Sequence, residues 1–169
     1  EFAFFKCSSL TQVTIPSSVN HIGNYSFSGC SSLMNIIISS SLTSIGSFTF
    51  RKCSSLAQVV IPHSVTKIED GAFQRCSQLK QITIPSSVTK IGNFAFSECS
   101  SLTKITIPSS VNEIKGGAFN GCNKLYEIII HPDNDKFQFL KKKLLICKSD
   151  LKNEEFDKLI NCFSILIGN

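Results

Sequence analysis

The sequence predicts a solenoid of the α/β class, in which every coil carries one short strand followed by a return arc. The first observation is a column of cysteines at one constant spacing: Cys7, Cys30, Cys53, Cys76, Cys99 and Cys122. The second is that apolar residues recur at the same spacing, in columns that begin at Phe4, Leu10, Val13 and Ile15. A period of about 23 residues is too short for a helix pair or a propeller blade, and it suits one strand plus one arc.

The strand of each repeat is predicted where apolar and polar residues alternate, as from Val13 to Ile15, because a strand with one buried face has this period. Pro16 follows and lacks the N–H group that a longer strand would need, so the strand ends there. In the return arc from Ile22 to Phe27, apolar residues are spaced nearer three than two, which predicts a short 3₁₀ or single-turn helical segment.

Composition limits the classes of protein to which the chain can belong. With 169 residues and 42% hydrophobic content, it can form one folded domain with a substantial interior. The net charge of +5 is small, so we expect no binding to nucleic acid. No apolar run approaches the roughly 20 residues that span a bilayer. Lys141, Lys142 and Lys143 are fewer than the roughly four to eight basic residues of a membrane-binding cluster, so we expect no direct membrane binding.

The cysteines and histidines lack the spacing of a reactive or metal-binding site. Cysteines of one column point the same way, which favours free, buried thiols. Disulfides between neighbouring coils are the alternative, because stacked Cα atoms about 5 Å apart are within reach. There is no Cys-x-x-Cys motif and no nearby histidine pair, and nothing supplies an exposed nucleophile with an oriented base. We therefore expect no metal, no cofactor and no catalytic site, and hence no enzyme.

The repeat resembles a known family. The motif is Leu10-x-x-Val13-x-Ile15-Pro16-x-x-Val19-x-x-Ile22-Gly23-x-x-Ser26-Phe27-x-x-Cys30. It is similar to the BspA-type leucine-rich repeat, and the similarity covers roughly residues 1–132. The resemblance implies a right-handed superhelical solenoid with a parallel β-sheet on its concave side. It also implies a role in adhesion, host-protein binding or assembly, without enzymatic activity.

The chain is expected to have two parts. Residues 1–132 comprise a partial repeat at 1–9, five full repeats and the strand of a sixth. Residues 133–169 are expected to form a C-terminal cap, with two short strands around Lys141–Lys143 and then an amphipathic helix that Asn153 could cap. The first coil is incomplete and uncapped, which predicts either a longer native chain or a second subunit at this end.

Solvent-facing positions of the predicted concave sheet are mostly neutral and polar, as in Thr11, Gln12 and Thr14. Six apolar residues interrupt this surface: Met34, Ile37, Ala57, Val60, Tyr126 and Ile129. Apolar patches of this kind often mark protein-binding surfaces, which makes these residues the predicted site. The alternative is that branched residues stand there only because they favour strands.

A second stripe of apolar side chains lies in the return arcs, where Phe2, Tyr25 and Phe48 occupy equivalent positions of successive coils. They are the predicted residues for self-association, and the alternative is that their rings cover the convex side of the core.

Two functions follow from these predictions. The first is a protein-interaction scaffold of adhesion or surface type that binds a protein of unknown identity through its concave sheet. The alternative is a self-assembling structural module that forms a homo-oligomer through its uncapped N-terminal coil. The compartment stays open at this point, with a cell-surface or secreted location favoured over a cytoplasmic one.

Overall fold

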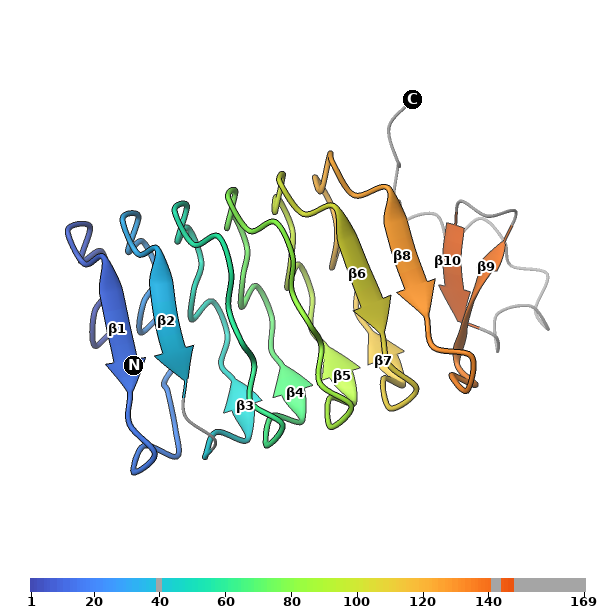
Figure 1. The fold of residues 1–169 in the computed structure, drawn as a ribbon, viewed down its shortest axis with the longest axis horizontal. Helices are drawn as coiled ribbons and strands as arrows, with labels where there is room; N and C mark the ends of the chain where they lie inside the picture. The colour runs from blue at the N-terminus through green and yellow to red at the C-terminus, as the bar shows by residue number, and fades with distance from the viewer. Residues whose placement is uncertain (39–40, 141–143, 148–169) are drawn as a thin grey trace.

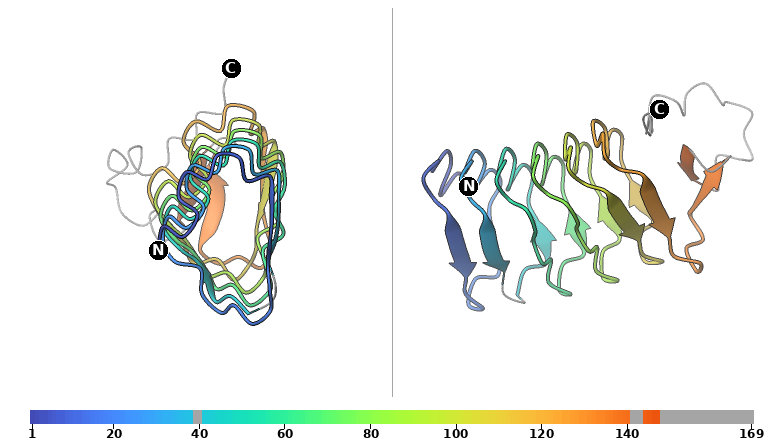
Figure 2. Two further views of the ribbon diagram at one scale, coloured as in Figure 1. Left: turned by 90° about the vertical axis from the view of Figure 1, so that its left-hand side faces the viewer. Right: turned by 45° about the horizontal axis from the view of Figure 1, so that its top comes forward.

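The computed structural model describes residues 1–38, 41–140 and 144–147, and most of them form a stack of coils. Figure 1 shows the coils following one another along the long axis of the molecule. Figure 2 shows, in a view along the stack, that successive coils follow nearly the same elongated outline. The structure is therefore a solenoid with parallel strands, as the sequence predicts.

One side of the solenoid carries the predicted strands. They are β1 (Gln12–Ile15), β2 (Asn35–Ile38), β6 (Lys104–Ile107) and β8 (Glu127–Ile130). β1 pairs with β2 and β6 with β8, both in parallel, and each residue lies opposite its equivalent in the paired repeat. Between these pairs, single bridges join Val60 to Thr83 and Gln81 to Lys104. We call the outward-facing residues of segments 11–15, 34–38, 57–61, 80–84, 103–107 and 126–130 the strand face.

A second parallel sheet, which was not predicted, lies where each return arc begins. Its strands are β3 (Ser44–Ile45), β4 (Lys67–Ile68), β5 (Lys90–Ile91) and β7 (Glu113–Ile114), in the order β3-β4-β5-β7. Each strand has two residues, of which the isoleucine is buried and the preceding residue faces outward. The isoleucine column that begins at Ile22 thus belongs to a second sheet and not to an arc.

The return arcs are not helical, so the expected 3₁₀ or single-turn helix is wrong for the part of the chain that the structure describes. Instead, backbone N–H groups alternate between two partners. Those of Tyr25, Phe27 and Gly29 donate to carbonyl groups of the next coil, at 3.0, 3.0 and 2.7 Å. Those of Ser28 and Cys30 donate to carbonyls three residues back in their own arc.

Residues with positive φ angles accompany this alternation. In the arc that contains Phe50, both Phe48 (φ 55°) and Lys52 (φ 59°) have positive φ angles. A right-handed helix cannot continue through such residues. The spacing of about three between apolar residues therefore reflects a succession of turns, each of which brings one side chain back to the core.

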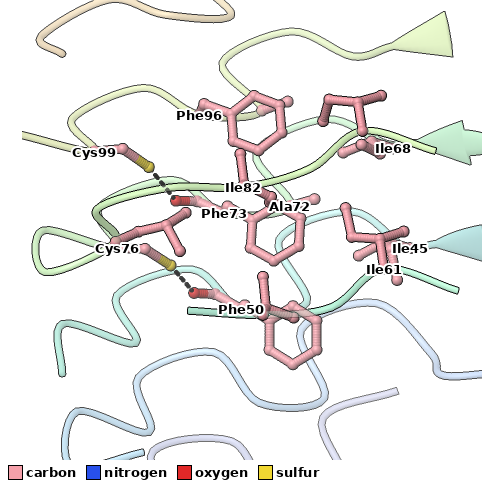
Figure 3. Close-up of a cluster of buried hydrophobic side chains, with 14 of the residues drawn as sticks. Ile45, Phe50, Ile61, Ile68, Ala72, Phe73, Cys76, Ile82, Phe96 and Cys99 are labelled. Carbon is pink, nitrogen blue, oxygen red and sulfur yellow. Dashed lines mark hydrogen bonds between the residues drawn. The ribbon is translucent and has the colours of Figure 1, made fainter. Parts of the chain in front are cut away.

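Ladders of identical side chains fill the interior. Six phenylalanines from Phe4 to Phe119 stack with ring centroids 5.0 to 5.7 Å apart and nearly parallel planes. Figure 3 shows three of them, Phe50, Phe73 and Phe96, which are completely buried. Offset stacking at this distance is favourable for aromatic rings, so each ring stabilises the docking of one coil on the next.

Phenylalanine and glycine alternate from Phe48 onward along the column that begins at Phe2, and the structure explains why. Gly71 has a φ angle of 61°, and a Cβ atom there would collide with the ring of Phe48 in the preceding coil. Gly117 (φ 68°) lies under the ring of Phe94 in the same way. A ring in one coil therefore occupies the space that a missing side chain leaves in the next.

Beyond the repeats, β9 (Phe137–Leu140) and β10 (Leu144–Cys147) pair antiparallel, one on each side of Lys141–Lys143. The repeat phase continues into this region. Asn134 and Phe137 stand one repeat after the buried residues Val111 and Ile114, and both are buried too. The predicted helix after Asn153 lies outside the described residues. Within the described residues, no helix could cross a membrane.

Candidate functional site

Four of the six predicted protein-binding residues meet on the strand face. Met34 and Ala57 are equivalent residues of neighbouring coils, and so are Ile37 and Val60. The side chains of Met34, Ile37 and Val60 are exposed to 57%, 55% and 78%, and Ala57 is half-buried. We call these four residues the apolar patch.

The structure does not bring the other two predicted residues to this patch. Tyr126 is 68% exposed and Ile129 is half-buried, and both lie three coils after Ala57 and Val60. At about 4.8 Å per coil, this separation is about 14 Å. The intervening coils present Lys80, Thr83, Thr103 and Thr106. The six predicted residues therefore form two separate groups on the strand face and not one continuous surface.

The hydrogen-bond ladder of the strand face is interrupted at the apolar patch. Each of the two coils of the patch is linked to its other neighbour, by the N–H groups of Met34 and Lys80 that donate to the carbonyls of Thr11 and Ala57, at 2.9 and 3.2 Å. Within residues 1–38 and 41–140, no backbone hydrogen bond joins residues 34–38 to residues 57–61. The patch thus coincides with the place where the sheet is least regular.

The aromatic stripe predicted for self-association forms a stack. The ring of Tyr25 lies 4.9 Å from those of Phe2 and Phe48, and both pairs are nearly parallel. Phe2 is 50% exposed, whereas Tyr25 and Phe48 are half-buried. The rings of Tyr25 and Phe48 therefore partly cover the arcs, and the ring of Phe2 is the most accessible of the three.

Two exposed phenylalanines of the first coil, Phe4 and Phe5, were not among the predicted site residues. A signal was available for Phe5, because its column continues with polar residues: Ser28, Arg51, Gln74, Ser97 and Asn120. Phe4 belongs to the core column, and its exposure reflects only the absence of a coil on one side of it in the structure.

The column cysteines are free, and five of the six are buried, with Cys7 exposed. Each buried thiol donates a hydrogen bond to a phenylalanine carbonyl of the preceding coil. The Sγ atoms of Cys76 and Cys99 lie 3.1 and 3.2 Å from the carbonyl oxygens of Phe50 and Phe73 (Figure 3). The thiol is thus a small donor that satisfies a buried acceptor, as well as a small apolar group.

Burial also makes these thiols weak acids. Desolvation raises the pKa of Cys122 to about 12, and it raises the pKa values of Cys76 and Cys99 well above 9.0, with a further increase from neighbouring cysteines. A thiol that stays protonated is a poor nucleophile and a poor metal ligand. The described residues contain no group of three or more histidine, cysteine or carboxylate side chains that could hold a metal ion.

Comparison with known proteins places the repeat in a family. Residues 1–126 and 44–162 match the family described as the BspA type leucine rich repeat region, in six copies. A comparison with curated protein sequences gave no match.

Solved structures of bacterial proteins are similar to the chain. A leucine-rich cell surface protein of Faecalibacterium prausnitzii is 37% identical, with a TM-score of 0.74 over 85% of this chain and 38% of its own. The leucine-rich repeat protein of T. pallidum is 34% identical, with a TM-score of 0.67 over 69% of this chain and 57% of its own. The pneumococcal vaccine antigen PcpA is 28% identical, with a TM-score of 0.70 over 82% of this chain and 34% of its own.

The chain spans between about a third and just over half of the length of these proteins. The match to the repeat family extends over most of the sequence and agrees with the repeating columns and the stacked coils. The chain belongs to the BspA-type leucine-rich repeat family.

Proposed function

We propose that the chain is a protein-interaction scaffold of adhesion or surface type, with a binding and not a catalytic role, and that its partner binds at the apolar patch. The strand face corresponds to the concave sheet that the family resemblance implies, which supports this surface as the binding side. Two structural neighbours, described as a cell surface protein and a vaccine antigen, support a surface location.

The exposure of Val60 is the observation that carries the proposal. Among the exposed large apolar residues that the structure describes, Val60 has the highest accessible fraction, 78%, so most of its apolar surface is available to a partner. Met34 and Ile37 are also more than half exposed, and the residues equivalent to Ala57 and Val60 in the next two coils are polar or charged. Burial of such side chains by a partner would contribute about 1.5–3 kcal/mol each.

The test uses peptides selected on the wild-type protein from a displayed random library. The double variant Met34→Asp and Val60→Lys is expected to bind the selected peptides about tenfold more weakly or worse, because it places two charges on the contact surface. The measurement is a dissociation constant from biolayer interferometry, with circular dichroism to show that the variant is folded.

The matched control is Thr103→Asp with Thr106→Lys, which introduces the same charges in the same two columns away from the patch. We expect this control to bind within about twofold of the wild type. If the patch variant binds the peptides as tightly as the control does, the apolar patch is not the binding site.

Self-association is a second candidate, favoured by the exposed phenylalanines of the first coil. Phe2 and Phe5 are 50% and 41% exposed, and their rings lie edge to face with centroids 5.5 Å apart. Two such surfaces in contact would remove several rings from water, which favours a homo-oligomer.

Light scattering over a concentration series tests this candidate. The wild type is expected to show a mass above that of the monomer, and the variant with Phe2→Ser and Phe5→Ser is expected to be monomeric. Phe94→Ser serves as the control, because Phe94 is similarly exposed (45%) but lies four coils away. A wild-type protein that stays monomeric at the highest concentration would eliminate this candidate.

A further inference from the structure

A long groove runs along the corner of the solenoid where each return arc ends. Its volume is about 670 Å³, and residues from successive coils line it, from Lys6 at one end to Asn123 at the other. These two ends are five coils apart, or about 24 Å at the usual spacing of parallel strands. The groove is distinct from the apolar patch, with which it shares no residue, and its length suits a linear ligand.

Positive charge dominates the wall formed by the residues just before the column cysteines. In order along the groove, the charged members of this wall are Lys6, Lys52, Arg75 and Glu98. Three cations and one anion give a net charge of +2. Arg75 is held by Glu98, whose two carboxylate oxygens both lie 3.0 Å from its Nε atom, whereas no ion pair engages Lys6 or Lys52 within the described residues.

The side chains of this wall lean along the groove toward the C-terminal coils. A Cβ atom on Gly29 would lie 3.1 Å from Cγ of Lys6, so the stem of Lys6 rests on the glycine of the next coil. Glu98 rests on Gly121 in the same way, at 3.1 Å. Because the glycines carry no side chain, this wall is open at Gly29, between Lys6 and Lys52, and at Gly121, after Glu98.

The opposite wall presents hydrogen-bond acceptors. The hydroxyl groups of Ser54, Ser77 and Ser100 donate to carbonyl groups of the preceding coil, at 3.3 to 3.4 Å. Each serine oxygen keeps lone pairs that can accept a hydrogen bond from a ligand. The groove therefore offers cations on one wall and acceptors on the other.

We propose that this groove binds an acidic polysaccharide. Such a chain is linear, carries sulfate or carboxylate groups for Lys6, Lys52 and Arg75, and carries hydroxyl donors on its rings for the serine oxygens. An acidic peptide offers the same charges, but its carboxylate side chains bring no donors to the serine oxygens, so only its backbone N–H groups could donate there. The anionic groups of the polysaccharide compete with Glu98 for the guanidinium group of Arg75.

The test measures binding of dextran sulfate, with unmodified dextran as the uncharged probe, by biolayer interferometry. Lys52→Gln is expected to weaken binding about three- to fivefold, because it removes an exposed charge contact. Glu98→Gln is expected to strengthen binding by a similar factor, because it frees Arg75 and removes a negative charge from the groove. Binding of the wild type should weaken as the salt concentration rises.

Two controls make the same charge changes outside the groove: Lys67→Gln on β4 and Glu113→Gln on β7, whose carboxylate pairs with Lys90 at 3.5 Å. Both are expected to bind dextran sulfate within about twofold of the wild type. If Lys67→Gln weakened the binding of dextran sulfate as much as Lys52→Gln did, the ligand would respond to net charge alone, and the groove would not be its site. If poly-glutamate bound as tightly as dextran sulfate, or if dextran sulfate did not bind at all, the ligand would not be an acidic polysaccharide.

Discussion

Above about pH 9, the free energy of unfolding is expected to fall steeply with rising pH. Burial raises the pKa values of Cys53, Cys76, Cys99 and Cys122, the last to about 12, whereas the same thiols in the unfolded chain titrate near 9.0. Below pH 9 the thiols are protonated in both states, so their contribution to stability is fully present. Above it, only the unfolded chain releases protons, and the contribution is lost progressively toward the folded pKa values.

The expected slope is large because the four thiols act together. Each contributes a little over about 1 kcal/mol per pH unit, or roughly 5 kcal/mol per pH unit for the set once the pH is well above 9. A domain with a typical stability of about 5–15 kcal/mol would unfold within a few pH units. Urea unfolding followed by circular dichroism between pH 7 and about pH 11, with reductant present, measures this slope.

The double variant Cys76→Ser and Cys99→Ser is the control. A serine hydroxyl can donate to the same phenylalanine carbonyls, but it does not titrate in this range. The variant is expected to show about half of the wild-type slope, even if it is less stable at neutral pH. An unfolding free energy that stays constant from pH 8 to about pH 11 would contradict the prediction.

Truncation of one ring in the phenylalanine ladder is expected to destabilise the stack more than the loss of any exposed ring. Phe73 is completely buried and stacks on Phe50 and Phe96, with centroids 5.4 and 5.5 Å away. Phe73→Ala should lower the free energy of unfolding by about 3–5 kcal/mol, because it leaves a cavity and removes two stacking contacts. The midpoint of urea unfolding reports this change.

Phe94→Ala provides the comparison, since Phe94 is a phenylalanine of the next coil with 45% of its surface exposed. Its loss should cost less than about 2 kcal/mol, since much of its surface is not removed from water on folding. Equal losses for the two variants would mean that the ladder does not dominate the stability of the stack.

The sequence predicts the ladders and the solenoid because burial repeats with the coil. The columns of large buried side chains are apolar in every coil, so a constant period appears at Phe27, Leu33 and their equivalents. The second sheet could not be predicted in this way, because a two-residue strand such as Lys67–Ile68 is too short to show alternation.

The conformation of the arcs was not predictable from local preference. Phe48, Lys52 and Arg75 adopt positive φ angles, although such residues rarely do. Hydrogen bonds to the next coil impose this conformation, and those partners lie almost a full repeat away in the sequence. A local pattern of apolar spacing therefore indicated a helix where contacts between coils require turns.

The sequence columns identified the residues of the apolar patch, and they also contain the distance between the two groups, because it follows from the number of coils between them. Tyr126 and Ile129 belong to the same columns as Met34 and Ile37, yet they stand four coils further along. Separation along the stack follows from the number of coils between two residues, whereas exposure depends on neighbours in three dimensions. The groove depends on both properties. Its walls are two columns that lie two residues apart in every coil, as Lys52 and Ser54 do, and its length follows from the number of coils.

The two directions of hydrogen bonding between coils give the solenoid a polarity. In the arcs, as at Phe27, N–H groups donate toward the C-terminal end, whereas on the strand face, as at Met34, they donate toward the N-terminal end. A coil can therefore be extended only by another coil in the same orientation. Whole repeat units can be duplicated or deleted without leaving a mismatched seam, so solenoid length can vary in evolution while each junction stays the same.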